Sequence, residues 1–300
     1  MNKRKKKGSG SQKMGYVYIM PWLVGFLVFQ LFPLGASLYY AFTDFSITSE
    51  PVFVGLKNFK TMFTDDPLFF KSLGNTLKYV MMSLPLKIIT ALFVALILNQ
   101  KMRGIHIYRT AYYIPSIFGG SVAIAILWRF LFMDGGMVNR LLNFLHLPSV
   151  PWLSDPKVAL FTLSLLSVWQ FGSSMVLFLA ALKQVPEDLY EAARIDGGGK
   201  IRTFFSITLP MITPILFFNI LMQLVNAFQD FTGAFVITNG GPLNSTYLFA
   251  LKLYDEAFTY YKMGYACALS WVLFILILIF TSVFFRFSDA VTYYEDGGDF

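Results

Sequence analysis

The sequence predicts an all-α, polytopic membrane protein with six transmembrane helices and a short cytoplasmic helix between the fourth and the fifth. Of its 300 residues, 56% are hydrophobic and 14% are charged, whereas an average soluble domain has about 25% charged residues. The apolar residues fall into blocks of about 20 or more, long enough to cross a hydrocarbon layer of about 30 Å as helix. The six expected blocks are 16–42, 76–98, 110–132, 158–182, 211–237 and 263–285. They lack the strict alternation of the strands in a membrane β-barrel.

The basic residues indicate how the chain is oriented. The run beside the first block consists of Lys3, Arg4, Lys5, Lys6 and Lys7. Basic residues next to a first span hold that end in the cytoplasm, so six spans place both termini in the cytoplasm. The net charge of +7 is therefore interpreted as a tail beside membrane lipid, not as an arm that binds nucleic acid. The expected divisions are a basic tail at 1–15, the six-span domain at 16–287 and a cytoplasmic tail at 288–300.

Several simple kinds of site and segment are not expected. The single Cys267 excludes an intrachain disulfide, and His106 and His146 lack the spacing of metal ligands. The first block is about twice as long as the core of a signal peptide, so it is interpreted as a span that is kinked or irregular at Pro33. The segment 43–75 is expected to be a long external loop.

The stretch at 183–210 is a patterned loop, too polar to cross a bilayer. Pro186 and the two acidic residues after it favour the start of a helix, where they suit the exposed N–H groups. The glycines at 197–199 favour its end about three turns later. Leu189 and two alanines give this helix an apolar face that suits docking into the groove of a partner. An incidental helical turn in a connecting loop is the alternative.

Four polar residues of the fifth block are spaced so that they share one face of a helix. They are Asn219, Gln223, Asn226 and Asp230. Polar side chains in a span usually face the bundle interior or a water-filled cavity, and amides with a carboxylate offer both donors and acceptors to sugar hydroxyls. We therefore predict a solute pathway here, with interhelical hydrogen bonding as the alternative. The residues of the fourth block expected to face the same cavity are Gln170, Ser173 and Ser174.

The polar residues within the spans do not suggest an enzyme. An intramembrane enzyme needs paired acids, a metal set or a nucleophile with its base, and the candidates are Asp230 and Lys87, on different spans. Lys87 is interpreted first as structural, through an ion pair, contact with water or snorkelling. Gly199-Lys200 resembles the end of a phosphate-binding loop, but Ile201 stands where Ser or Thr is required. We therefore expect no ATP site in this chain.

The patterned loop resembles the EAA loop of bacterial importer permeases of the ATP-binding-cassette class. The matching residues are Glu191, Ala192, Ala193, Asp196, Gly197, Ile207, Leu209 and Pro210. Further matches at 54–59, 114–115 and 237–242 are similar to the sugar-importer branch, the maltose-type (MalF-like) permeases. The chain resembles the compact six-span members more closely, including those for oligosaccharides and glycerol phosphate. The prototype has extra N-terminal spans and a large external domain, which this sequence lacks.

This resemblance implies a bacterial inner-membrane protein that forms half of a translocation pathway together with a second permease subunit. It also implies two cassette ATPase subunits that hold ATP and Mg, an extracellular solute-binding protein, and a carbohydrate as the solute. The chain itself is expected to hold no cofactor and no metal and to catalyse no reaction. Its EAA-like loop would be the place where the ATPase pushes on the spans.

Two groups of alternatives stay open. An importer permease for another solute, such as glycerol phosphate, a phosphonate, a polyamine or an amino acid, fits the same loop. Replacement of Asp230 by Asn would then weaken transport of a cationic solute most. An ATP-independent channel or secondary carrier explains the polar face but gives the loop no role, and the internal repeats frequent in such carriers are not detectable in the sequence.

Overall fold

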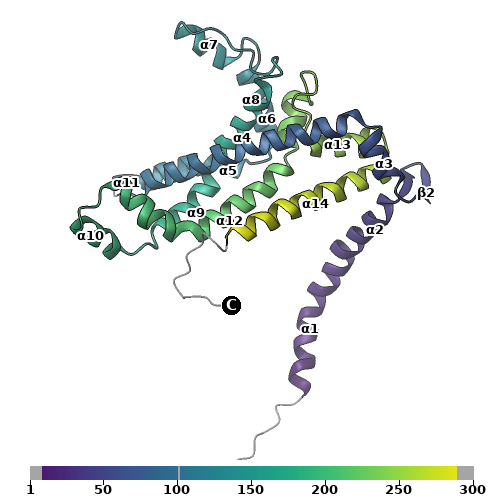
Figure 1. Ribbon diagram of the computed structural model, residues 1–300, viewed down its shortest axis with the longest axis horizontal. Coiled ribbons are helices and arrows are strands. Elements are labelled where there is room, and N and C mark those ends of the chain that lie inside the picture. Colours follow the sequence, from purple (N-terminus) through teal and green to yellow (C-terminus); the bar gives the residue numbers. More distant parts are fainter. Residues whose placement is uncertain (1–8, 101, 289–300) are drawn as a thin grey trace, which may run out of the picture. The chain divides into compact units, whose positions relative to one another are not determined.

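The computed structural model describes residues 9–100 and 102–288, most of which are helical (Figure 1). The chain divides into two compact units. Unit 1 combines the residues up to Asp65 with Tyr254–Val272, and unit 2 combines Asp66–Leu253 with the residues from Leu273 onwards. The basic run at 3–7 and residues 289–300 of the predicted C-terminal tail lie outside the described residues.

Unit 1 begins with a long apolar helix that contains one irregular turn. Its parts are α1 (Ser9–Phe26), the π-helical turn η1 (Leu27–Leu31) and α2 (Phe32–Ala41). Pro33 has no N–H and disturbs the regular hydrogen bonds of the turn before it. The N–H of Phe32 donates instead to the carbonyl of Leu27, five residues back. The irregular turn thus lies just before Pro33, where the sequence predicts a kink, and α1 starts inside the predicted tail at 1–15.

The segment 43–75, predicted as a long external loop, contains regular secondary structure, and its last residues belong to α4 (Pro67–Leu98). Its elements in unit 1 are β1 (Thr43–Ser46), β2 (Ser49–Phe53) and α3 (Lys57–Thr64). The two strands pair in antiparallel fashion, with Thr43 opposite Phe53. Asn58 of α3 donates hydrogen bonds to the carbonyls of Ala41 and Thr43, at 2.9 and 2.8 Å. Each of these elements is too short to give a periodic signal beside the long apolar blocks.

The remainder of unit 1 comes from far along the chain. It consists of η4 (Asp255–Thr259) and the first residues of α14 (Met263–Ser288). Gly264 in α14 lies so close to the hairpin that a Cβ there would overlap the carbonyl oxygen of Thr43. A backbone-to-backbone approach of this kind requires a residue without a side chain.

Unit 2 is a bundle of helices. Its elements are α4 (Pro67–Leu98), α5 (Ile105–Ile117), α6 (Val122–Phe132), α7 (Met137–Phe144), α8 (Ala159–Trp169), α9 (Gly172–Leu182), α10 (Glu187–Ile195), α11 (Lys200–Thr203), η2 (Phe204–Thr208), α12 (Leu209–Phe228), η3 (Ala234–Thr238) and α13 (Phe249–Tyr254). α4 packs along α8, α9 and α12, and α5 packs against α9. Figure 1 shows α10 and α11 at one end of this bundle.

Small residues on α4 shape the core of unit 2. Ala91 and Ala95 are fully buried and belong to one apolar cluster with Met175 and Phe178 of α9 and Ile212 of α12. Small side chains let helices in a membrane approach closely, and packing then replaces the hydrophobic effect as the source of stability. This cluster holds α4, α9 and α12 together beside the end of the bundle that carries α10.

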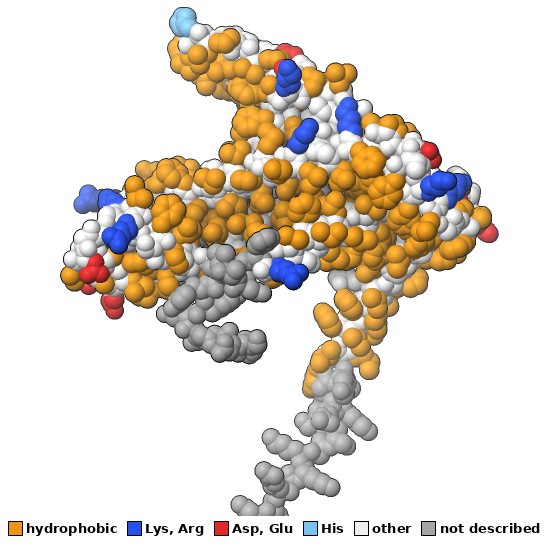
Figure 2. All heavy atoms as spheres, viewed as in Figure 1, with side chains coloured by type: hydrophobic (Ala, Val, Ile, Leu, Met, Phe, Trp, Pro, Cys, Tyr) orange, Lys and Arg blue, Asp and Glu red, His pale blue; other side chains and the backbone are white. Residues whose placement is uncertain are grey.

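The prediction of a polytopic helical membrane protein is confirmed. The described residues contain five helices that are long and apolar enough to cross a membrane, or six spans if the pair α8 and α9, bent by 47°, counts as one. Their surfaces suit lipid. In the most apolar window of Tyr18–Ala41 no residue is buried, and Figure 2 shows apolar side chains covering the helices of unit 2 while charged ones gather around α10 and α11.

Three of the predicted spans have the wrong bounds. The helix predicted at 76–98 begins at Pro67, nine residues earlier. The block 110–132 is not one helix, because the chain turns at 118–121 between α5 and α6. The block 211–237 is displaced, since the helical span runs over Lys200–Phe228 and the chain breaks after it. A hydropathy profile reports how apolar a stretch of sequence is. It therefore does not detect a helix break whose residues are about as apolar as the helices around it. Gly119 and Gly120, both poor helix formers, are the local signal for the first break.

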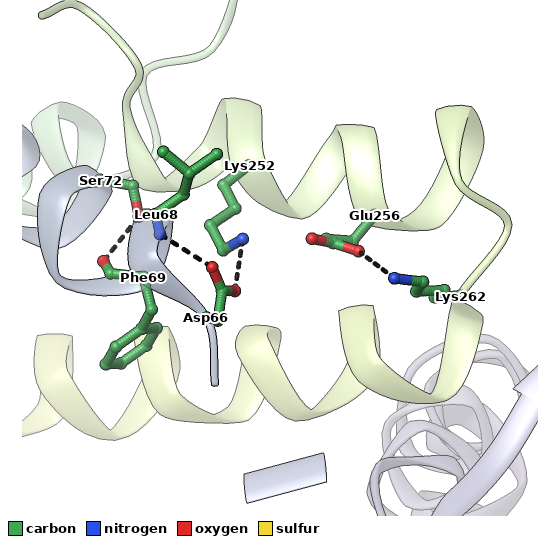
Figure 3. A network of polar contacts seen from close by, with 7 residues as sticks. All are labelled: Asp66, Leu68, Phe69, Ser72, Lys252, Glu256 and Lys262. Atoms are coloured by element: carbon green, nitrogen blue, oxygen red, sulfur yellow. Dashed lines mark hydrogen bonds and ion pairs between the residues drawn. The ribbon is translucent and has the colours of Figure 1, made fainter. Parts of the chain in front are cut away.

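A buried ion pair fixes the start of α4 (Figure 3). Lys252 Nζ of α13 lies 2.6 Å from Asp66 Oδ2, and the two side chains are 2% and 12% exposed. The Oδ1 atom of Asp66 accepts a hydrogen bond of 2.9 Å from the N–H of Leu68 and thereby caps α4. Within unit 1, Glu256 and Lys262 form a longer pair, 4.0 Å apart, in which the lysine is exposed.

Candidate functional site

A polar cavity of about 400 Å³ lies inside unit 2. Three interruptions in the helices meet at its wall: the turn at 118–121 between α5 and α6, the bend at 170–171 between α8 and α9, and the break at 229–231 between α12 and η3. At membrane depth, non-helical backbone is tolerated where it is buried in protein or lines a water-filled cavity. The convergence of three breaks on one polar cavity marks it as the candidate site for a solute.

The bend between α8 and α9 is stabilised by Ser116 of α5. Its Oγ donates to the carbonyl of Gln170 at 3.1 Å and accepts from the N–H of Ser173 at 3.0 Å. These are two of the backbone groups that the bend leaves without helical partners. Gly172, beside them, lies against the backbone of α5 so tightly that a Cβ would stand 2.8 Å from the Cα of Tyr113. Sequence analysis missed Ser116, because nothing local relates it to a residue 54 positions away.

Asp230 lies in the cavity wall but not on the predicted helical face. α12 ends at Phe228, so the expected spacing of one continuous helix fails at Asp230. The Tyr79 hydroxyl donates to Oδ2 of Asp230. The carboxylate is therefore held by a donor from α4.

The other three residues of the predicted face separate into two groups. Gln223 and Asn226 line the cavity, as predicted. Asn219 is fully buried and pairs with α9. Its Oδ1 accepts from Ser174 Oγ at 2.9 Å and its Nδ2 donates to the Ser174 carbonyl at 3.2 Å. For Asn219 and Ser174 the structure thus shows interhelical hydrogen bonding, while Gln170 and Ser173 do line the cavity.

Replacement of Asn219 by leucine is expected to lower stability, whereas replacement of Asn226 by leucine is expected to lower solute uptake. Asn219→Leu removes two buried hydrogen bonds and leaves Ser174 Oγ without its partner, which costs about 1–2 kcal/mol of stability. Asn226→Leu removes an exposed amide of the cavity and should leave stability nearly unchanged while it lowers solute uptake. Thermal unfolding in detergent and uptake assays on the same preparations separate the two. If Asn219→Leu lost as much uptake as Asn226→Leu and kept its stability, the assignment of Asn219 to interhelical hydrogen bonding would be contradicted.

Lys87 lines the cavity one helical turn after Ser83, which lines it as well. The sequence interpretation ranked structural roles first for Lys87 and did not consider Ser83. A signal was present, since the two residues are four apart around Pro85 in α4, and residues at that spacing share a helix face. The part of the chain that the structure describes contains no cluster of three or more His, Cys, Asp or Glu suited to a metal ion.

The EAA-like loop contains the predicted short helix, α10, which has nine residues. Glu187 and Asp188 occupy its first turn. At its end the N–H of Gly197 donates to the carbonyl of Arg194 and the N–H of Gly198 to that of Ala193, at 3.1 and 2.8 Å. This is the Schellman pattern, which needs a left-handed residue, and Gly197 supplies it with φ +72°.

The surface of α10 is open to a partner. Glu191, Ala192, Asp196 and Gly197 are exposed, Ala193 is half-buried, and the neighbouring Ile195 is 86% exposed. A groove of about 460 Å³ runs along the helix and includes Glu191 and Arg194 in its wall.

α10 is attached to the span that follows it. The Tyr190 hydroxyl lies 3.1 Å from the Thr208 hydroxyl of η2, and Tyr190 packs with Ile207 against the core cluster of α4, α9 and α12. Leu209 and Pro210 lie within one helical run, because α11, η2 and α12 follow one another without interruption from Lys200 to Phe228. Pro210 has no N–H, and the π-helical turn η2 lies directly before α12, as η1 lies before Pro33.

A helical membrane protein with broken spans around a polar cavity and an exposed helix at one end belongs to the class of transport permeases. Residues 67–292 match the family described as binding-protein-dependent transport system inner membrane component. The chain belongs to this family: it is the permease component of an ATP-binding-cassette importer, located in the inner membrane, and such a component is not itself an enzyme.

Relatives and solved structures agree over almost the whole chain. The chain is 47% identical over 284 residues to the probable ABC transporter permease protein YesP of Bacillus subtilis (strain 168), covering 94% of this chain and 92% of YesP. It is 34% identical over 292 residues to the sn-glycerol-3-phosphate transport system permease protein UgpA of Pectobacterium atrosepticum, covering 95% and 97%. A chain of a bacterial alginate ABC transporter, crystallised with an alginate pentasaccharide-bound periplasmic protein, has the same fold, with a TM-score of 0.82 at 21% identity and coverage of 97% and 99%.

Proposed function

We propose that this chain is one transmembrane subunit of an ATP-driven carbohydrate importer and forms half of its translocation pathway. The observation that carries the proposal is the cavity at the three helix breaks, where Gln170, Gln223 and Asn226 offer amides. Amide groups both donate and accept hydrogen bonds, which suits a solute rich in hydroxyl groups. The fold also accommodates a saccharide transporter, since the alginate transporter has it.

The remaining partners follow from the family. A second permease subunit would close the other side of the pathway, a binding protein would deliver the solute from outside, and two cassette ATPase subunits would hold ATP and Mg. Both termini would be cytoplasmic. This chain would supply the α10 surface and no cofactor. Family membership in a binding-protein-dependent system supports partners of this kind.

A movement of α10 would be transmitted to the cavity through one continuous helical run. An ATPase that binds the exposed face of α10, at Glu191 and Gly197, would move Tyr190 and with it Thr208. The helical run Lys200–Phe228 then leads to Gln223 and Asn226 in the cavity wall. A channel or secondary carrier would have no use for an exposed helix tied to a pathway helix in this way.

Two substitutions in α10 test this function. Glu191→Lys reverses an exposed charge, and Gly197→Val forces a branched residue into a left-handed conformation that costs an L-residue about 1–2 kcal/mol. Both should abolish solute-stimulated ATP hydrolysis and weaken co-purification of the ATPase from the native membrane. Gly199→Ala is the matched control, because Gly199 has no positive φ and a Cβ there meets nothing within 4 Å.

The result that overturns the proposal is equally direct. The chain would then be purified alone or as a homo-oligomer, and it would transport solute without ATP. Retention of coupled ATP hydrolysis in both α10 variants would keep the importer class but remove the role of this helix.

One second candidate is favoured by a specific observation. UgpA, a glycerol-phosphate permease, is similar to this chain over its whole length, and a lysine lines the cavity. Import of a phosphorylated polyol is therefore the runner-up to import of a saccharide.

A further inference from the structure

Two donors in the cavity wall have no acceptor within the protein. Ser83 is 1% exposed, and its Oγ has no hydrogen-bond partner among the described residues. Lys87, one turn further along α4, makes no hydrogen bond and no ion pair within residues 9–100 and 102–288, and its charge interacts with Asp230 at longer range only. Both residues line the cavity from the same helix.

The carboxylate in the cavity wall, that of Asp230, differs from these two donors because it has a hydrogen-bond partner within the protein. Asp230 accepts a hydrogen bond from the Tyr79 hydroxyl. One of its oxygens is thus engaged by a donor of the protein, whereas the ammonium group of Lys87 can donate up to three hydrogen bonds and donates none to the described residues. A solute in this cavity therefore meets a carboxylate with a protein donor and an ammonium group without an acceptor among the described residues.

We propose that the solute carried through this cavity bears an anionic group, a carboxylate or a phosphate, that is bound by Lys87 and Ser83. Buried polar groups without partners are costly, and an anion between these two side chains would accept from both. Hydrogen bonds of this kind, between a charged donor and a charged acceptor, are about twice as strong as neutral ones. Gln223 and Asn226 remain available for the hydroxyl groups of the same solute.

This inference rests on the proposed function and restricts the class of solute that the importer would carry. It assigns Lys87 as the residue that selects charge, and it names the solute as an acidic saccharide or a phosphorylated sugar or polyol. A neutral saccharide would offer the ammonium group of Lys87 only hydroxyl oxygens, which accept weaker hydrogen bonds than an anion does. A polyamine would place positive charge beside it.

The experiment compares solutes that differ in charge but little in shape. The complete importer, with its own binding protein and ATPase, is reconstituted in proteoliposomes. ATP-driven uptake of four probes is measured at saturating concentration: digalacturonate, its dimethyl ester, glycerol 3-phosphate and maltotriose. Four variants are compared with the unmodified chain, namely Lys87→Met, Lys87→Arg, Ser83→Ala and the control Lys78→Met. Lys78 is on the same helix but is exposed and outside the cavity.

We expect uptake of an anionic probe and weak uptake of the ester and of maltotriose. Lys87→Met should lower anionic uptake about tenfold or more, equivalent to about 1.4 kcal/mol, while Lys87→Arg, which keeps the charge, should lose much less. Ser83→Ala should have a smaller effect in the same direction, and Lys78→Met none. Preference for digalacturonate or for glycerol 3-phosphate distinguishes a carboxylate from a phosphate. Because the binding protein is the same in every sample, differences between variants report on the cavity.

Three results would overturn the inference. Good uptake of maltotriose or of the ester that is unchanged in Lys87→Met refutes the role of Lys87 and leaves the carbohydrate importer intact. Equal loss of charged and neutral uptake in Lys87→Met, with no rescue by Lys87→Arg, shows a structural role. ATP hydrolysis that responds to none of the four probes counts against the proposed function as well.

Discussion

Replacement of Asp66 by Ala is expected to lower the free energy of unfolding of unit 2 by about 3–5 kcal/mol, because the buried Lys252 then loses the carboxylate that lies 2.6 Å from its ammonium group. The pair is 2.6 Å long and almost fully buried, so water cannot replace the lost interaction. The same carboxylate caps α4 through the N–H of Leu68, and loss of a cap adds about 1 kcal/mol. Thermal unfolding of the purified protein in detergent, followed by gel filtration, measures the effect.

A double variant and an exposed pair serve as controls. In Asp66→Ala with Lys252→Met the buried ammonium group is removed together with the Asp66 carboxylate, so part of the lost stability should return. Lys57→Met breaks the pair with Asp44, in which both side chains are more than half exposed, and such pairs contribute about 0–1 kcal/mol. If Asp66→Ala behaves like Lys57→Met, the buried pair does not stabilise α4.

Gly172→Ala is expected to disrupt the bend between α8 and α9, although alanine favours helix over glycine by about 1 kcal/mol. The new Cβ would stand 2.8 Å from both Ser116 Oγ and the Cα of Tyr113. The backbone of α5 would have to move, and the two hydrogen bonds that Ser116 makes at the bend would be lost. Overpacking of a tight contact typically costs about 1–3 kcal/mol, so we expect lower thermal stability together with loss of transport.

Gly74→Ala provides the matched comparison. Gly74 is also helical, but a Cβ there meets nothing within 4 Å. Alanine should therefore stabilise α4 slightly, by about 0.5–1 kcal/mol, and uptake should be unchanged. The two substitutions are chemically identical and have opposite expected signs. Equal stability of both variants would show that the contact between α5 and α9 is loose.

The class of fold could be predicted because it depends on local composition. Apolar blocks long enough to span a bilayer are visible residue by residue, and the bounds of α14 show how well this works where a helix is unbroken. The breaks could not be predicted in the same way. At the bend, Gln170 stands between Trp169 and Phe171, and a hydropathy window as long as a span averages out so short a polar stretch.

The candidate site was predicted in part for the same reason. Gln223 and Asn226 were found because they lie on one continuous helix. Asn219 follows the same spacing yet faces α9, since the surroundings of a helix change along its length. The Tyr79 contact with Asp230 joins residues 151 positions apart, and no local pattern encodes such a pair. The end of α10 could be predicted, because Gly197 is required by the backbone itself.

The unbroken course of α4 has a mechanical consequence. Most walls of the cavity are divided into short helices, whereas α4 runs for 32 residues and contributes Ala95 and Leu98, near its end, to the core cluster against which Tyr190 of α10 packs. Lys87 lies about 16 Å from Leu98 along the axis, so a tilt of about 5° pivoting there would displace Lys87 by about 1.4 Å. A displacement of that size takes a hydrogen bond of about 2.9 Å out of its effective range. In the proposed transport cycle, α4 would thus act as a lever arm that turns a small rotation at its far end into release of the solute.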